Sequence, residues 1–250
     1  FFDGMKAEGQ ENIINLLRCA WAGSQKYGAL VWSGDIKSSF PSMKNQVAAG
    51  LNMGIAGIPW WTTDIGGFFG ANINDPEFHE LLVRWFEYGC FCPVMRLHGY
   101  RWPLQPQYGT TGGATCVSGA PNEVWSYTDQ VCEILSDYLR LRERMLPYIT
   151  ELMEEAHEKG TPVMRPLFYD FPEDKESWNV ETEYMFGPKV LVKPITDADA
   201  RETDVYLPGG ASWTNAWTGE TFEGGQKVHV AAPIEQIPLF TRDGYKLPMK

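Results

Sequence analysis

Short hydrophobic runs alternate with longer stretches that carry a helical stripe of apolar residues over the first 160 residues. The short runs predict buried β-strands, because they have the length and the continuous apolar character of strands in parallel sheets. They lie at 13–21, 29–32, 58–61 and 94–97. Apolar residues recur every four positions between 41 and 56, and a similar stripe covers 76–88, so both stretches are predicted helices. The order strand, helix, strand, helix, strand favours a parallel sheet with helical crossovers.

A loop rich in Gly, Pro, Thr and Gln occupies residues 101–122 and is long enough to be a functional candidate. Helical spacing of apolar residues then predicts one long helix over 123–159, with Asn122 as its N-cap. Pro147 is expected to kink this helix, and Gly160 is placed to end it.

Short β-rich runs separated by Gly, Pro and Asp turns follow Gly160 and predict an antiparallel β-sandwich. These runs lie at 163–169, 184–192, 203–207, 228–231 and 237–241. The pattern divides the chain into an α/β domain at 1–160 and an all-β domain at 161–250.

Composition narrows the classes of partner. The chain has 250 residues, 44% of them hydrophobic, which is ample for a packed core. Its formal net charge of −11 disfavours nucleic acid and anionic membrane surfaces. No signal peptide or membrane-spanning segment is recognisable. Five cysteines without a CxxC pair argue against zinc and against a disulfide framework, so reduced thiols and a cytoplasmic location are expected. No nucleotide or metal motif is present, and no cofactor is predicted.

Asp35 is the first candidate for catalysis, because it follows the predicted strand 29–32 through a flexible Gly34. Trp32 lies close enough in sequence to remove water from a neighbouring carboxyl group. Desolvation raises a carboxyl pKa, as a general acid working near neutral pH requires. The alternative is that Asp35 caps the following turn or helix.

Asp64 also lies just beyond a predicted strand, where it could accept a hydrogen bond from a sugar hydroxyl or orient a neighbouring arginine; the glycine pair after it also occurs in structural turns. Arg96 and His98 alternate along the end of the 94–97 run and therefore point to the same side. If that side faces a barrel mouth they can bind hydroxyl groups, and otherwise they lie in solvent.

Large aromatic residues gather beside these polar groups, and rings together with bidentate polar side chains are typical of sites that bind pyranose sugars. They are Trp32, Trp60, Trp61 and Phe68. About half of them could equally be core residues. The carboxyl ends of parallel barrel strands form one face of the barrel. The groups around Asp35, Asp64 and Arg96 therefore together predict a sugar site on that face.

Several segments resemble glycoside hydrolase family 31, which contains α-glucosidases, α-xylosidases and α-transglycosylases. They are RCAWAGSQK at 18–26, WSGD at 32–35, DIGGF at 64–68, RLHG at 96–99 and RMLPY at 144–148, and GTPVMRP at 160–166 extends the likeness into the β-rich part. The resemblance covers nearly the whole chain.

The resemblance implies a role for each candidate in a retaining exo-acting α-glycosidase. Asp35 becomes the general acid/base. Arg18 and His98 become hydroxyl-binding residues, Trp32 and Phe68 walls of the same subsite, and Asp64 and Arg96 supporting polar residues. The implied substrate is an oligosaccharide or other α-glycoside with a terminal α-linked glucose or xylose, and no metal or cofactor is implied.

The chain departs from the family pattern because it has no motif for the nucleophilic Asp. Residues 5–11 imitate that motif and would place Glu8 there, but too few residues separate Glu11 from Arg18 for the helix that must intervene. We therefore expect the second half of a (β/α)8 TIM barrel, strands five to eight, followed by the antiparallel β-sandwich. The expected partner is the missing N-terminal half of the same polypeptide, and the chain alone is expected to be inactive.

Three other interpretations stay open at this stage. The parent protein could be an α-transglycosylase of the same family, in which the loop 101–122 shapes the acceptor site. The chain could be a carbohydrate-binding fragment without catalysis. Residues 161–250 could serve only to brace the barrel, since they show no cluster of titratable groups.

Overall fold

Parallel strands lie at the centre of the N-terminal part of the chain, in the order β1 (Asn15–Leu17), β2 (Ala29–Trp32) and β3 (Trp61–Thr62). The computed structural model describes residues 1–249. Val31 and Trp61 pair across β2 and β3, and both side chains are buried. The parallel strands with crossover connections that the sequence predicts are therefore confirmed.

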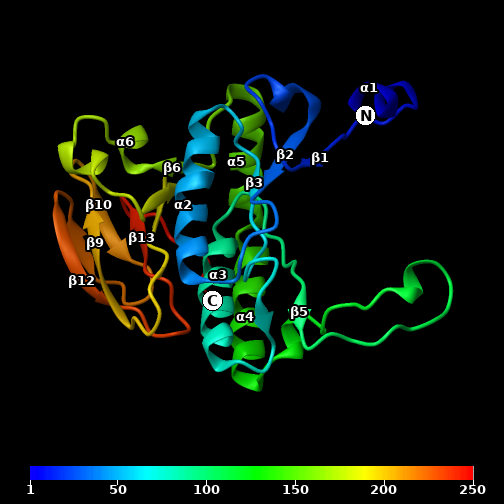
Figure 1. Cartoon of the computed structure of the whole chain (residues 1–250). Helices are drawn as coiled ribbons and strands as arrows, with labels where there is room; N and C mark the ends of the chain where they lie inside the picture. The colour runs from blue at the N-terminus through cyan, green and yellow to red at the C-terminus, as the bar shows by residue number, and fades with distance from the viewer. Residues whose placement is uncertain (250) are drawn as a thin grey trace.

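Helices pack together on one side of these strands, as Figure 1 shows. They are α2 (Phe40–Ile55), α3 (Pro76–Cys90), α4 (Asp129–Arg144) and α5 (Leu146–Lys159), and a short α1 (Phe2–Ala7) stands apart at the N-terminus. Ser39 caps α2 by accepting from the amide of Ser42 at 3.3 Å, and Asp75 caps α3 by accepting from Glu77 at 3.0 Å. Both helices then begin near a proline, which suits their first turn because its amides lack helical partners.

Two predicted strands are shorter or less regular than expected. The run at 13–21 forms a strand only over β1, which pairs with β2 alone among the described residues. The run at 94–97 lies parallel to β3 but forms only an isolated bridge between Ile65 and Leu97. Before it, Arg142 donates to the carbonyl oxygens of Cys90, Cys92 and Pro93 at 2.7–2.8 Å, so this turn is fixed by a side chain and not by a strand ladder.

The predicted single helix over 123–159 is also corrected. A 3-10 turn at Val124–Ser126 comes first, and α4 starts only at Asp129 with Thr128 as its cap in place of Asn122. α4 and α5 meet at Met145, because Pro147 cannot donate within a continuous helix. Gly160 ends α5 with a φ of 71°, as the sequence predicts.

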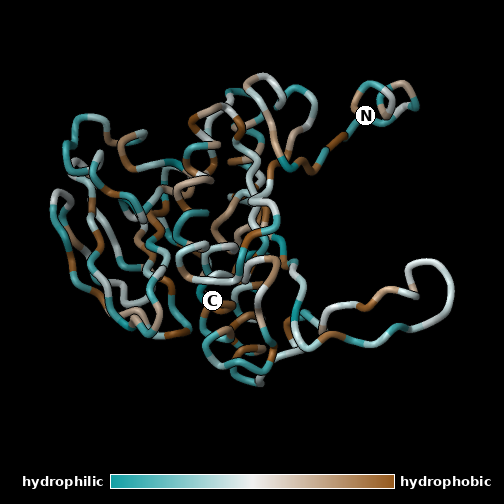
Figure 2. The backbone as a smooth tube through the Cα atoms, viewed as in Figure 1, coloured by the Kyte–Doolittle hydropathy of each residue, from teal (hydrophilic) through white to brown (hydrophobic). Residues whose placement is uncertain are grey.

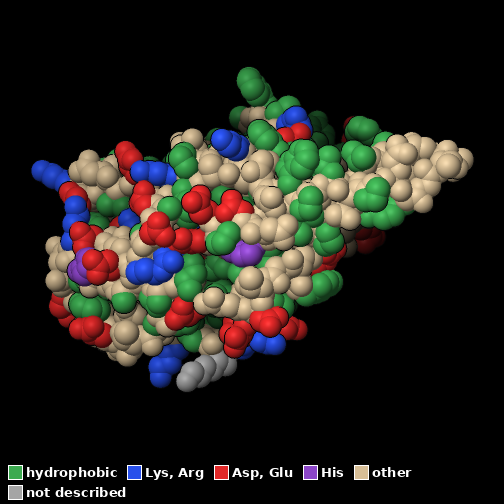
Figure 3. Space-filling view, turned by 60° about the horizontal axis from the view of Figure 1, so that its bottom comes forward, with side chains coloured by type: hydrophobic (Ala, Val, Ile, Leu, Met, Phe, Trp, Pro, Cys, Tyr) green, Lys and Arg blue, Asp and Glu red, His purple; other side chains and the backbone are tan. Residues whose placement is uncertain are grey.

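Residues 103–121 form an arm that projects from the body of the molecule (Figures 1 and 3). The arm leaves from β5 (Arg101–Trp102), which pairs in parallel with β4 (Ala71–Asn72). Gln105 and Ser118 bridge its two limbs, and a 3-10 turn at Gly112–Thr115 forms its tip. The other 3-10 turns are Ser24–Tyr27 and Lys175–Trp178.

The C-terminal part consists of antiparallel β-structure. One sheet has the order β11-β10-β13-β8-β7-β6, and β12 pairs with β9 in a second sheet. Apolar and polar residues alternate along β12 in Figure 2, and its apolar residues Val228 and Val230 face a core shared with Trp213 and Phe240. The strands are β6 (Met164–Pro166), β7 (Tyr184–Phe186), β8 (Val190–Val192), β9 (Glu202–Leu207), β10 (Ser212–Asn215), β11 (Thr221–Glu223), β12 (Gln226–Ala231) and β13 (Leu239–Arg242).

Sequence patterns located most of this part but not all of it. The run at 163–169 is a strand only to Pro166 and then turns into α6 (Leu167–Asp170). The run at 184–192 is a hairpin, β7 and β8, which turns at Gly187. β10 and β11 were not predicted, because they are short and mostly polar.

Close packing of α2 against β6 joins the two parts. A Cβ atom on Gly54 would lie 2.9 Å from Pro162 and 3.1 Å from the carbonyl oxygen of Met164, so only glycine allows this approach. One hydrophobic cluster consequently continues from the strands of the N-terminal part into the C-terminal sheet.

A buried polar network on α3 and α4 strengthens the same interface. Arg84 and Glu87 are fully buried, and Arg84 Nη1 donates to Glu87 Oε2 at 3.1 Å. Arg84 also donates to the carbonyl oxygens of Ala232 at 2.6 Å and Ala200 at 3.0 Å in the C-terminal part. Tyr138 donates to Glu87 at 3.1 Å and accepts from the amide of Ile237 at 3.0 Å. Both Nη atoms of Arg84 and both carboxyl oxygens of Glu87 therefore have hydrogen-bond partners, as buried polar groups require.

No helix among residues 1–249 is long and apolar enough to cross a membrane. The five cysteines are unpaired, and burial raises the pKa of the Cys90 and Cys92 thiols to about 12. These two thiols therefore pack as small apolar groups and are unreactive near neutral pH.

The stability of the chain is expected to depend on the protonation of Glu87. Burial raises the pKa of this carboxyl from 4.5 to about 8, so the folded state binds an extra proton between these pH values. The contribution of Glu87 to the free energy of unfolding is then fully present below pH 4.5 and falls as the pH rises toward 8. The slope approaches ~1.4 kcal/mol per pH unit for one such proton. Glu87→Gln is expected to flatten this decline, as measured by urea unfolding at several pH values. Equal slopes in the two proteins would contradict the assignment.

Candidate active site

Backbone hydrogen bonds connect the loops that follow β2, β3 and the 94–97 segment. Ser33 donates to the carbonyl oxygen of Thr62 at 3.2 Å, and Phe68 donates to Ile36 at 2.7 Å. Tyr100 in turn donates to Phe68 at 2.6 Å. Because the strands are parallel, all these loops lie at their carboxyl ends, where barrel enzymes carry their active sites.

Arg18 and Asp35 meet at this edge. Arg18 Nη2 donates to Asp35 Oδ2 at 2.7 Å, although β1 and β2 bring them from different loops. The Arg18 guanidinium also lies 5.5 Å from the centre of the Trp32 ring, a cation–π contact. The Arg18 and Asp35 side chains are 62% and 42% exposed. The desolvated surroundings that the sequence predicts for Asp35 are therefore not provided by residues 1–249 alone.

Asp64 and Arg96 form a second ion pair among these loops. Asp64 is fully buried and accepts from Arg96 through Oδ1, whereas Oδ2 has no partner among residues 1–249. Burial raises the pKa of the Asp64 carboxyl, and the charges of Arg96 and His98 oppose that rise. The charge of Asp35 raises it further, so Asp35, Asp64, Arg96 and His98 belong to one electrostatic cluster. Asp64 is placed to orient Arg96 and is too buried to attack a substrate.

Aromatic rings line the same edge unequally. Phe68 is half-buried and stacks on His98 with ring centres 5.6 Å apart and planes at 28°. Trp32 and Trp60 are also half-buried, so part of each ring can face a ligand. Trp61 is a core residue packed against α2.

Arg101 holds the loops of the candidate site together, although the sequence pattern does not indicate this role. Its guanidinium is fully buried and donates to the carbonyl oxygens of Gly67 at 2.7 Å and Ile65 at 3.1 Å. Its Nε donates at 3.1 Å to Asn122, the residue that follows the arm in sequence. Arg101 therefore ties the loop that carries Asp64 and Phe68 to the base of the arm. An arginine beside a Gly- and Pro-rich loop gives no such signal in sequence.

Gly66 and Gly67 make this arrangement possible. Both have positive φ, 83° and 74°. A Cβ on Gly67 would lie 2.7 Å from the backbone of Ser38, and one on Gly66 would lie 2.9 Å from Arg101. The glycine pair is thus required both by its conformation and by close approach.

The edge now holds an accessible carboxylate, two guanidinium groups, an imidazole and half-buried aromatic rings on a parallel α/β sheet. Such groups at the carboxyl ends of parallel strands are typical of sugar-binding sites in α/β-barrel enzymes. Residues 1–152 match the family model described as the glycosyl hydrolases family 31 TIM-barrel domain, and residues 160–247 match the glycosyl hydrolase family 31 C-terminal domain. The chain belongs to glycoside hydrolase family 31.

Similar proteins carry the names of glycoside hydrolases. The structure of a GH31 α-xylosidase from a soil metagenome, complexed with xylose, has 54% sequence identity and a TM-score of 0.94, covering 99% of this chain and 37% of that one. An α-xylosidase of Saccharolobus solfataricus is 37% identical over 99% of this chain and 32% of its own length. Alpha-glucosidase 2 of Bacillus thermoamyloliquefaciens is 34% identical over 95% and 28%. The chain spans about a third of the length of these relatives.

Replacement of Arg101 by lysine is expected to loosen the loop at 64–68. An ammonium group keeps the charge but cannot reach Ile65, Gly67 and Asn122 together, so buried acceptors lose their donors. The expected loss in the free energy of unfolding is about 1–3 kcal/mol, with faster amide hydrogen exchange at residues 66–68.

The matched control is Arg140→Lys, because Arg140 is exposed and pairs only with Asp137. This control is expected to stay within about 0.5 kcal/mol of the unsubstituted chain. If both variants changed stability equally, Arg101 would not have the role assigned to it.

Proposed function

We propose that this chain supplies the acid/base part of the active site of a retaining exo-α-glycosidase, which removes terminal α-linked xylose or glucose from oligosaccharides. The observation that carries the proposal is the position of Asp35: accessible, at the carboxyl end of β2, bonded to Arg18 and adjacent to the buried Asp64–Arg96 pair.

Asp35 has the access that proton transfer needs. Arg18 occupies its Oδ2, and Oδ1 accepts no hydrogen bond within residues 1–249. Oδ1 is therefore free to reach a glycosidic oxygen. In the acid step Asp35 protonates that oxygen as the bond breaks, and in the second step it takes a proton from water.

Arg18 carries several guanidinium donors, so it can donate to a sugar hydroxyl as well as to Asp35. His98, stacked on Phe68, and Arg96, oriented by Asp64, are placed to bind further hydroxyls.

The nucleophile is expected in a part of the barrel outside this chain. Retention needs a second carboxylate about 5 Å from the first. Asp64 is buried and held by Arg96, and Glu8 is exposed at the end of α1, away from the strand edge (Figure 1). Neither is suited to attack the anomeric carbon. We therefore place strands five to eight of the barrel in this chain and the nucleophile on the fourth.

An α-xylosidase is favoured over an α-glucosidase by the soil-metagenome relative, whose structure is described as complexed with xylose. Transglycosylation would use the same residues, with a sugar in place of water. A purely carbohydrate-binding role would use the same aromatic rings and hydroxyl-binding groups, and it differs from catalysis in lacking a carboxylate at the nucleophile's position.

The chain alone is expected to release no nitrophenol from nitrophenyl α-xyloside or α-glucoside above the buffer rate, because one of the two carboxylates is absent. Substantial turnover by the purified chain would contradict the division of the site.

Joining the chain to the N-terminal part of the soil-metagenome α-xylosidase tests Asp35 itself. In this chimera Asp35→Ala is expected to lower kcat/KM for an α-xylosyl disaccharide by about 10²–10⁴. For α-xylosyl fluoride, whose leaving group needs no proton, kcat/KM is expected to change little. Asp197→Ala, an exposed site in the C-terminal part, is the control. Equal losses on both substrates would rule out the acid role.

A further inference from the structure

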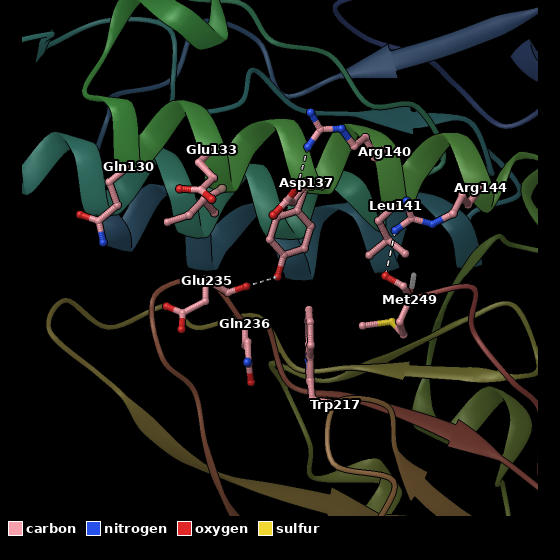
Figure 4. Close-up of a pocket in the computed structure, with 12 residues that line it drawn as sticks. Gln130, Glu133, Asp137, Arg140, Leu141, Arg144, Trp217, Glu235, Gln236 and Met249 are labelled. Carbon is pink, nitrogen blue, oxygen red and sulfur yellow. Dashed lines mark hydrogen bonds and ion pairs between the residues drawn. The ribbon is translucent and has the colours of Figure 1, made fainter.

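A cleft of about 630 Å³ lies between α4 and the C-terminal part, on the outer side of the helical layer (Figure 4). Its upper wall is a stripe along α4 that runs from Gln130 to Arg144. Its lower wall carries Trp217, Glu235, Gln236 and Met249. None of the residues that line it belongs to the loops of the candidate active site.

Hydrogen bonds fix both walls of the cleft. The hydroxyl oxygen of Tyr138 on α4 accepts from the amide of Ile237 at 3.0 Å, and Arg144 donates to the carbonyl oxygen of Met249 at 2.9 Å. Trp217 Nε1 donates to the carbonyl oxygen of Ile237 at 2.7 Å, which fixes the indole ring. The cleft is therefore open before any ligand arrives, and little conformational entropy opposes binding.

Trp217 gives the cleft an apolar surface. The ring is half-buried and stands between Gln236 and Met249 in Figure 4, with an edge toward α4. Its face is directed along the cleft, on the side where Gln236 and Glu235 lie. A fixed indole face beside amide and carboxylate groups suits the apolar C–H face and the hydroxyl edge of a pyranose.

The charges of the cleft select against ions of either sign. Three carboxylates, on Glu133, Asp137 and Glu235, oppose phosphates and other anions. Two guanidinium groups, on Arg140 and Arg144, oppose cations. A neutral polyhydroxylated ligand avoids both penalties and can donate to the carboxylates and accept from the amides of Gln130 and Gln236.

We propose that this cleft is a second saccharide-binding site, which holds a neutral α-linked oligosaccharide away from the bond to be cleaved. The inference rests on the proposed function, since it assumes that such sugars are the substrates. A second site would keep the substrate near the enzyme and raise its effective concentration at the catalytic edge.

The experiment titrates an α-xylosyl-glucose disaccharide into the chain labelled with 5-fluorotryptophan and follows the ten tryptophans by ¹⁹F NMR. Trp217→Phe assigns the reporter of the cleft, and Trp32→Phe assigns that of the candidate active site. Trp178→Phe assigns a control ring that is 58% exposed and stacked on Phe168 elsewhere on the surface. The Trp217 resonance is expected to shift and saturate, including in a His98→Ala variant, while the Trp178 resonance stays in place.

Gln236→Ala supplies a test that leaves the ring in place. It removes only the side chain, so the backbone bond from Arg84 to the Gln236 carbonyl can persist. The dissociation constant read at Trp217 is expected to rise by about fivefold, the equivalent of one stacking or hydrogen-bond contact. Glu158→Gln, on the exposed side of α5, is the matched control and is expected to change nothing.

A Trp217 resonance that does not move would overturn the second site, and a simultaneous shift at Trp32 would leave the proposed function intact. Equal shifts at Trp217 and Trp178 would indicate non-specific contact and would also overturn it. A shift caused by tetramethylammonium and not by the disaccharide would assign the cleft to cations instead.

Discussion

The candidate site depends on the way in which consecutive strand-end loops bond to one another. Backbone hydrogen bonds run from Ser33 to Thr62 and from Phe68 to Ile36, so the loop after β2 cannot move without the loop after β3. Arg101 extends this connection by holding the carbonyl oxygens of the 64–68 loop from a buried position. Without these bonds Arg18 and Asp35 would lie on independent flexible loops, and the 2.7 Å contact between them would not be maintained.

The C-terminal part stabilises this edge indirectly, because it packs against the helices that cover the strands. It contacts the helices through the α2–β6 packing and the Arg84–Glu87–Tyr138 network. A buried polar network is stabilising only while its partners are in place, so this interface tolerates few relative positions of the two parts. Helix positions, and with them the strand ends, are thereby fixed. The structural bracing considered for residues 161–250 is consistent with this arrangement.

Sequence patterns predicted the elements whose cues are local. The stripes on α2 and α3, the stop at Gly160 and the alternating strands of the C-terminal part all depend on neighbouring residues. The misses involve partners far away in sequence: Arg142 fixes the turn before 94–97, and β10 is held by β13 although three of its four residues are polar. The helix begins only at Asp129 because a 3-10 turn intervenes after Asn122, and such turns have no strong sequence pattern. For the site, motif resemblance located the polar groups, whereas Arg101 could be identified only from its buried contacts.

We propose that the edge formed by these loops binds the sugar ring next to Asp35. A crystal structure of the chain, or of a longer protein that contains it, with xylose bound would test this binding mode. We expect a pyranose ring with hydroxyls on Arg18 and His98, walls from Trp32 and Phe68, and the Asp35 carboxyl beside the anomeric oxygen. A ring bound at this edge with Asp35 directed away from its anomeric oxygen would show that Asp35 is not the acid.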